Sequence, residues 1–124
     1  MNSSCYIAIF HSTVHVFTTS ARGTPKARYY MGVYMFSAFW PYEILAVSTV
    51  PISTHETYTI KMLWKLETFY DYVVYPAGLV LSADRTQLIL SYGYQDVQSR
   101  IMILDVKGLI DSLTIIERKN RVCW

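Results

Sequence analysis

Few side chains in this 124-residue chain could carry out catalysis or bind a metal. His11 and His15 stand four residues apart, which places them on one face of a strand, but His55 lies far along the chain. Cys5 would act as a nucleophile only beside a histidine in an electropositive pocket. Cys5 and Cys123 match no zinc-site spacing. We therefore expect no metal site and no catalytic residue.

Asp96 is the carboxylate whose surroundings are most informative. It follows the run SYGYQ, so it stands where a strand would end, close to Tyr92 and Tyr94. A carboxylate accepts hydrogen bonds from sugar hydroxyls, and aromatic rings stack against sugar faces. The competing interpretation is an Asx turn that caps the connection over residues 95–99. Glycoside hydrolysis needs two carboxylates across the scissile bond, and spacing identifies no such pair here.

The elements that would position these residues are short strands, so we expect an all-β fold with antiparallel sheets. Residues 12–27 are polar and predict a long loop, in which Val14 and Val16 would form at most a minor strand. The polar run SADRT (82–86) between two apolar runs predicts a hairpin. The expected strands are residues 5–11, 28–39, 42–49, 73–81, 87–94 and 100–106.

The C-terminal part of the chain ends the strand pattern. Leu109, Ile110 and Leu113 have helical spacing, so residues 107–113 predict a short helix followed by a tail over 114–124. Residues 53–72 fit either a helical turn or a loop that packs its aromatic side chains. Gly32, within the strand 28–39, indicates a bulge or a close approach of the backbone.

Composition limits the classes of protein. The chain is 52% hydrophobic and 16% charged, which suits one folded domain over residues 1–124. A net charge of +2 is too small for a nucleic-acid-binding protein. The longest apolar run, 73–81, is far shorter than the ~20 residues of a membrane-spanning helix. With no secretory signal pattern, we expect a cytoplasmic protein with two free thiols, although a disulfide between the termini is the open alternative.

Four segments, in order, resemble glycoside hydrolase family 130. Residues 73–96 (VVYPAGLVLSADRTQLILSYGYQD) resemble the family's VVFPCGLV segment, its following hairpin and its YYGAAD-like strand end. Residues 6–12 (YIAIFHS) resemble a strand that ends in Tyr-His-Gly, and residues 28–36 (RYYMGVYMF) resemble a Tyr-x-x-Gly-Ala strand. Residues 41–52 (PYEILAVSTVPI) resemble a segment that ends in Pro-Glu-Pro-Ile/Leu.

The resemblance implies a fold and an activity class. Members of the family are five-bladed β-propellers that act on β-mannosides, mostly as phosphorylases that release mannose 1-phosphate with inversion. A complete propeller needs roughly 300 residues, so this chain resembles about two blades at the C-terminal part. The family's general acid lies in its N-terminal half, to which nothing here corresponds. The resemblance therefore implies a segment that is inactive alone, with no cofactor and with inorganic phosphate as the co-substrate.

The resemblance also implies a site for a sugar or sugar phosphate. His11 corresponds to the family's phosphate-contacting histidine, although Ser12 replaces the following glycine. Tyr29 corresponds to a tyrosine near the phosphate, and Asp96 to the aspartate of the GAAD motif, which faces the sugar. Ala77 replaces the cysteine of FPCG, which indicates a packing change only. Two functions remain open: a glycosidase-related propeller segment, or a non-catalytic β module that binds carbohydrate or serves a structural role. Unpaired edge strands would favour self-association or contact with upstream blades.

Overall fold

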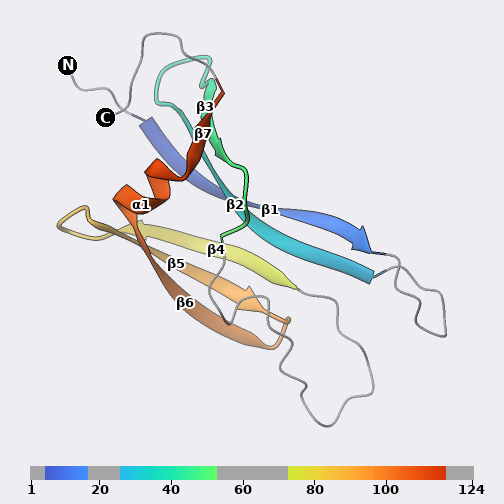
Figure 1. The fold of residues 1–124 in the computed structure, drawn as a ribbon. Coiled ribbons are helices and arrows are strands. Elements are labelled where there is room, and N and C mark those ends of the chain that lie inside the picture. The colour runs from blue at the N-terminus through green and yellow to red at the C-terminus, as the bar shows by residue number, and fades with distance from the viewer. Residues whose placement is uncertain (1–4, 17–25, 53–72, 117–124) are drawn as a thin grey trace.

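The computed structural model describes residues 5–16, 26–52 and 73–116, which form two antiparallel sheets and one short helix (Figure 1). The first sheet has the strand order β1-β2-β3-β7, and the second sheet has the order β4-β5-β6. The sequence-based expectation of a mostly antiparallel β chain with a short helix is therefore confirmed. The elements are β1 (Cys5–Val16), β2 (Lys26–Ser37), β3 (Ile44–Ser48), β4 (Val74–Leu81), β5 (Gln87–Tyr94), β6 (Gln98–Asp105), α1 (Val106–Asp111) and β7 (Leu113–Ile115).

A long hairpin of β1 and β2 forms most of the first sheet. Both strands have 12 residues, and they pair without interruption from Cys5 opposite Ser37 to Val16 opposite Lys26. The expectation of a loop over residues 12–27 is thus wrong at both of its ends. That expectation rested on polarity, but cross-strand pairing satisfies the backbone of a strand whatever the polarity of its side chains.

Gly32 allows a close approach between β1 and β2, as its place within a strand predicted. It pairs with Phe10, and a Cβ atom built on Gly32 would lie 2.4 Å from Cζ of the Phe10 ring. The ring therefore occupies the space that any other residue would fill at position 32. The bulge that the glycine also suggested lies elsewhere in β2, between Met35 and Phe36, where β3 pairs with it.

The second sheet follows its predicted hairpin closely. In β5 the even-numbered side chains are buried, while the odd-numbered ones are mainly exposed. This alternation sends Leu88, Leu90, Tyr92 and Tyr94 to one face. The turn that joins β4 to β5 centres on Asp84, whose carboxylate accepts hydrogen bonds within the turn. The sequence predicted β4 to within one residue and β5 without error, because both strands pair locally.

One hydrophobic core joins the two sheets. The first sheet contributes Met31 and Val33, which are fully buried. The second sheet contributes the buried face of β5 together with Val74 and Met102. Figure 1 shows the hairpin of β1 and β2 running alongside β4 of the second sheet. Because the side chains of both sheets form one cluster, neither sheet has a separate core. The buried members of the cluster are Met31, Val33, Ile52, Val74, Leu90, Tyr92, Tyr94 and Met102.

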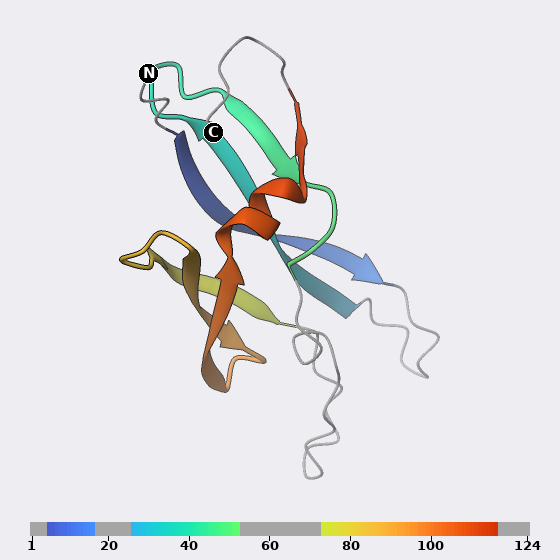
Figure 2. The same ribbon diagram turned by 60° about the vertical axis from the view of Figure 1, so that its left-hand side comes forward.

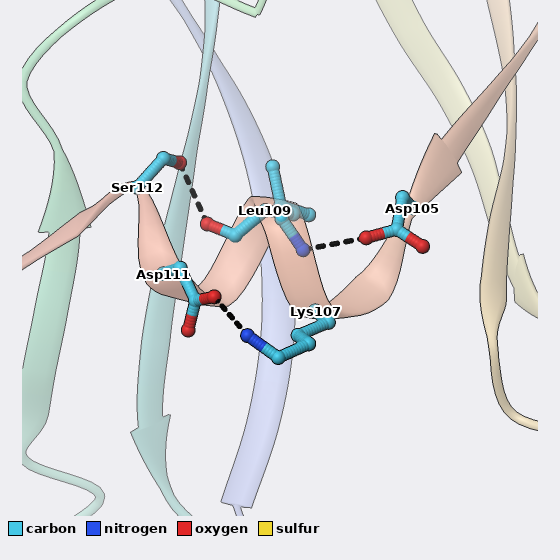
Figure 3. Close-up of polar contacts among 6 residues, drawn as sticks. Asp105, Lys107, Leu109, Asp111 and Ser112 are labelled. Carbon is cyan, nitrogen blue, oxygen red and sulfur yellow. Dashed lines mark hydrogen bonds and ion pairs between the residues drawn. The ribbon is translucent and has the colours of Figure 1, made fainter.

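Helix α1 carries the chain from the second sheet back to the first (Figures 1 and 2). The Asp105 carboxylate accepts a hydrogen bond of 2.6 Å from the Gly108 backbone N–H and thereby caps the first turn (Figure 3). Lys107 forms an ion pair with Asp111 one turn later, and the Ser112 hydroxyl donates to a backbone carbonyl at the end of the helix.

The segment after α1 corrects the sequence prediction. Residues 113–115 are not the end of a helix and the start of a tail, because they form β7, which pairs antiparallel with β3. Leu113 packs against the common core, which explains why its apolar character resembled a continuing helical face. Short strands of this kind depend on a distant partner, so their own sequence does not predict them.

Two other sequence predictions concern the cysteines and the segment 53–72. Cys5 is disulfide-bonded, so the expectation of a free thiol there is wrong. Cys123 and the ambiguous segment 53–72 lie outside the described residues. No helix in the part of the chain that the structure describes has the length and apolar character needed to cross a bilayer.

Candidate functional site

His11 lies between aromatic rings of both sheets. Its ring centroid is 5.1 Å from that of Tyr75 on β4 and 6.1 Å from that of Tyr29 on β2. Both pairs are tilted, with interplanar angles of 51° and 46°. The sequence predicted that His11 and Tyr29 would lie together, and the structure places them in contact. We refer to His11, Tyr29 and Tyr75 as the His–Tyr cluster.

Strand pairing explains how His11 reaches this position. His11 pairs with Met31 across the hairpin, and directly opposed residues send their side chains to the same face of a sheet. Met31 is fully buried between the sheets, whereas His11 is exposed because β1 is the outer strand of the first sheet. Tyr29 stands two residues from Met31 and therefore shares its face. The His–Tyr cluster is thus at the rim of the interface between the sheets.

Tyr75 is the member of the cluster that the sequence analysis missed. It stands within VVYPAGLV, where it was read only as part of an apolar strand. The structure leaves 56% of its surface exposed, while its neighbour Val74 is buried. Alternation along β4 gave no signal for this contact, because a residue next to a core valine is expected on the side of the sheet that faces away from the core. Only the packing of the two sheets brings Tyr75 to His11.

Asp96 lies in a tight turn between β5 and β6. Gln95 and Asp96 both have a φ of 56°, and the Val97 backbone N–H donates to the Tyr94 carbonyl over 3.2 Å. Two successive residues with positive φ and this hydrogen bond define a type I′ turn, in which Asp is well tolerated. Asp96 is therefore a turn residue by its backbone geometry, and its carboxylate is exposed.

The turn also positions Asp96 relative to β4. The Gln95 backbone N–H donates to the Val73 carbonyl over 2.8 Å, which joins the turn to the segment that leads into Tyr75. In the second sheet β4 adjoins β5, so Asp96 is at the sheet end at which Tyr75 enters β4. The structure records no direct contact between Asp96 and His11 in the described ranges. The convergence of Asp96 with the other two predicted site residues stays a prediction.

Two polar side chains near Asp96, those of Arg100 and Gln95, differ in their hydrogen bonding. The Arg100 guanidinium lies 3.9 Å from the centroid of the Tyr94 ring and donates two hydrogen bonds to the Gln98 side-chain carbonyl. By contrast, Oε1 of Gln95 is buried and has no hydrogen-bond partner among the described residues. Buried acceptors are normally paired, so this oxygen marks a place where a donor would be stabilising.

A separate cleft of about 310 Å³ lies between the end of β3, β6 and α1. Its size is at the lower end of the range for small-molecule sites. Ile52, which lines it, donates its backbone N–H to Met31 on β2, whereas His11 pairs with Met31 from β1. The cleft therefore lies along one edge of β2, and the His–Tyr cluster lies along the other edge, where β1 pairs. The lining residues are Ser48, Val50, Pro51, Ile52, Leu104, Asp105, Gly108, Leu109 and Ser112.

No group of three or more His, Cys, Asp or Glu side chains is placed to hold a metal ion within residues 5–16, 26–52 and 73–116. Comparisons of the chain with models of protein families, with curated proteins and with solved structures found no match. The resemblance to glycoside hydrolase family 130 consequently rests on the four sequence segments alone.

Proposed function

We propose that this chain is a non-catalytic β module that binds a sugar or a sugar phosphate at the His–Tyr cluster. The observation that carries the proposal is the contact of His11 with both Tyr29 and Tyr75 at an exposed rim. Two tyrosine rings offer apolar faces on which a sugar ring can stack. The imidazole between them can donate a hydrogen bond to a phosphate group.

Asp96 has a secondary role in this proposal. Its carboxylate would accept hydrogen bonds from sugar hydroxyls at the neighbouring end of the second sheet. The unpaired Oε1 of Gln95 in the same turn is consistent with a missing donor, such as a water or a ligand hydroxyl. The ligand would then lie with its anionic end at His11 and its hydroxyls towards Asp96.

The ancestry of the module belongs to the same proposal. Two antiparallel sheets that pack through one core are what two consecutive propeller blades would present. Under this proposal the chain is related to mannoside phosphorylases and would carry out no phosphorolysis alone, with other blades or chains as partners. A cytoplasmic location stays a prediction, and the disulfide at Cys5 favours an oxidising compartment instead.

Thermal shift with mannose, mannose 1-phosphate and inorganic phosphate tests the proposed function. A ligand at ten times its Kd stabilises by about 1.4 kcal/mol, which would raise the Tm of a domain of this size by about 5 °C. We expect His11→Ala and Tyr75→Ala each to remove the shift by mannose 1-phosphate.

Val14→Ala is the matched control for this experiment. Val14 is on the same strand as His11 and is exposed, but an odd spacing of three residues places it on the opposite face. The control should keep the full shift. An unchanged shift in both His11→Ala and Tyr75→Ala would contradict binding at the cluster, and loss of the shift in Asp96→Ala alone would move the site to the turn.

A further inference from the structure

The second sheet has an apolar side that no part of the described chain covers. Its core side packs on the first sheet, whereas Val80, Ile89, Ile101 and Ile103 point the other way, and we call these four residues the aliphatic face. Their side chains are 63%, 36%, 70% and 61% exposed. Three of them form one row across the sheet, because Val80 pairs with Ile89 and Ile89 pairs with Ile103.

The positions around the aliphatic face carry almost no charge. The other residues that alternate onto this side in β5 and β6 include Ser91, Gly93 and Ser99. Asp105 at the far end is the exception, and its carboxylate is already used to cap α1. An antiparallel sheet with one side in water normally has polar residues on that side. Strands that are apolar on both sides are typical of sheets that are covered on both sides.

We propose that the aliphatic face packs against the same face of a second copy of this chain, forming a two-fold symmetric dimer. A neutral face can meet itself without repulsion, even though each chain has a net charge of +2. A partner with a charged surface would leave its own charges unpaired against these side chains. β-branched side chains on two antiparallel sheets interdigitate in aligned face-to-face packing.

The size of the face indicates how strong the dimer would be. Three strands spaced about 4.8 Å apart, each of eight residues that rise about 3.4 Å, give a face of about 14 Å by 27 Å, or about 400 Å². Stable complexes bury about 800 Å² on each partner. The dimer should therefore be weak and dependent on concentration. This inference uses none of the residues of the proposed sugar site, since no residue of the aliphatic face belongs to the His–Tyr cluster.

Sedimentation of the full chain over about 1–500 µM tests the proposal. We expect the wild-type protein to pass from monomer to dimer, with Ile103→Lys weakening dimerisation by about tenfold or more, because the two-fold axis would bring like charges together. Val14→Lys adds the same charge at an exposed position of the first sheet and should leave dimerisation unchanged. A wild-type chain that remains monomeric throughout would overturn the proposal, as would an Ile103→Lys variant that dimerises like the wild type.

A second variant separates loss of the face from loss of the fold. Ile103→Thr keeps a β-branched side chain that suits a strand and should also weaken dimerisation while the far-ultraviolet circular dichroism stays that of the wild type. Pairing through the edge of β6 that no described strand occupies is the competing arrangement. Such pairing uses backbone groups, so it would survive both substitutions, and that result would also overturn the proposal.

Discussion

At the scale of single residues, Gly32 shows how one missing side chain determines local packing. The Phe10 ring lies against the Gly32 backbone, and a Cβ atom there would be 2.4 Å from Cζ of the ring. Gly32→Ala should therefore destabilise the protein by about 1–3 kcal/mol, the usual cost of overpacking. Urea denaturation would measure this loss. Combining Gly32→Ala with Phe10→Ala should cost less than the sum of the two single changes, and strict additivity would contradict the direct clash.

The site residues also show what sequence can predict at this scale. His11 and Tyr29 were placed in one site only by the resemblance to glycoside hydrolase family 130, and no local pattern of the sequence pairs their strands. Tyr75 could not be predicted, because its contact with His11 joins two sheets, and no local pattern encodes how sheets pack. For Asp96 the sequence left two interpretations, and the structure adds that the residue lies in a turn with its carboxylate exposed.

At the scale of elements, the β4–β5 hairpin depends on the Asp84 carboxylate. Its Oδ1 accepts hydrogen bonds from the Ser82 hydroxyl and from the Thr86 backbone N–H and hydroxyl. These bonds, with the Ser82 bond contributing most, lower the pKa of Asp84 below its ordinary value of 3.8. Since the folded pKa lies below the unfolded one, the stabilisation is complete above the unfolded value and is lost as the pH falls through the folded value.

The resulting prediction concerns stability in acid. Between about pH 5 and pH 2, the wild-type protein should lose more stability than Asp84→Asn, because the amide has no charge to lose. Denaturant unfolding at both pH values measures the difference. Asp96→Asn, in the other turn of the same sheet, is the matched control and should follow the wild type. Equal losses in the wild type and in Asp84→Asn would show that the turn hydrogen bonds do not depend on the carboxylate charge.

The elements differ in how far their own sequence determines them. The β4–β5 hairpin could be predicted because its turn and both strands are consecutive. β7 could not, because a three-residue strand forms only by pairing with β3, about 65 residues earlier in the chain. The outer half of the β1–β2 hairpin was missed for a related reason. Its polar residues are held in strands by pairing, a long-range property that composition does not reveal.

At the scale of the whole molecule, the two sheets share one core, so they should unfold together. Leu90 on β5 is 1% exposed and belongs to the same cluster as Met31 and Val33 of the first sheet. Leu90→Ala removes buried methyl groups from the centre of this cluster. We expect a loss of about 2–5 kcal/mol in the free energy of unfolding, because the removed atoms leave a cavity that both sheets line.

Ile89→Ala provides the matched control, since Ile89 is next to Leu90 in β5 but belongs to the aliphatic face. In dilute solution, where the protein is monomeric, Ile89→Ala should cost clearly less than Leu90→Ala. Its cost should increase with protein concentration as the dimer forms, whereas the cost of Leu90→Ala should not, because mass action stabilises only the copies whose face is intact. Urea denaturation at two protein concentrations measures both effects. Equal costs for the two variants at low concentration would contradict the assignment of the two sides of the second sheet, on which both the shared core and the dimer depend.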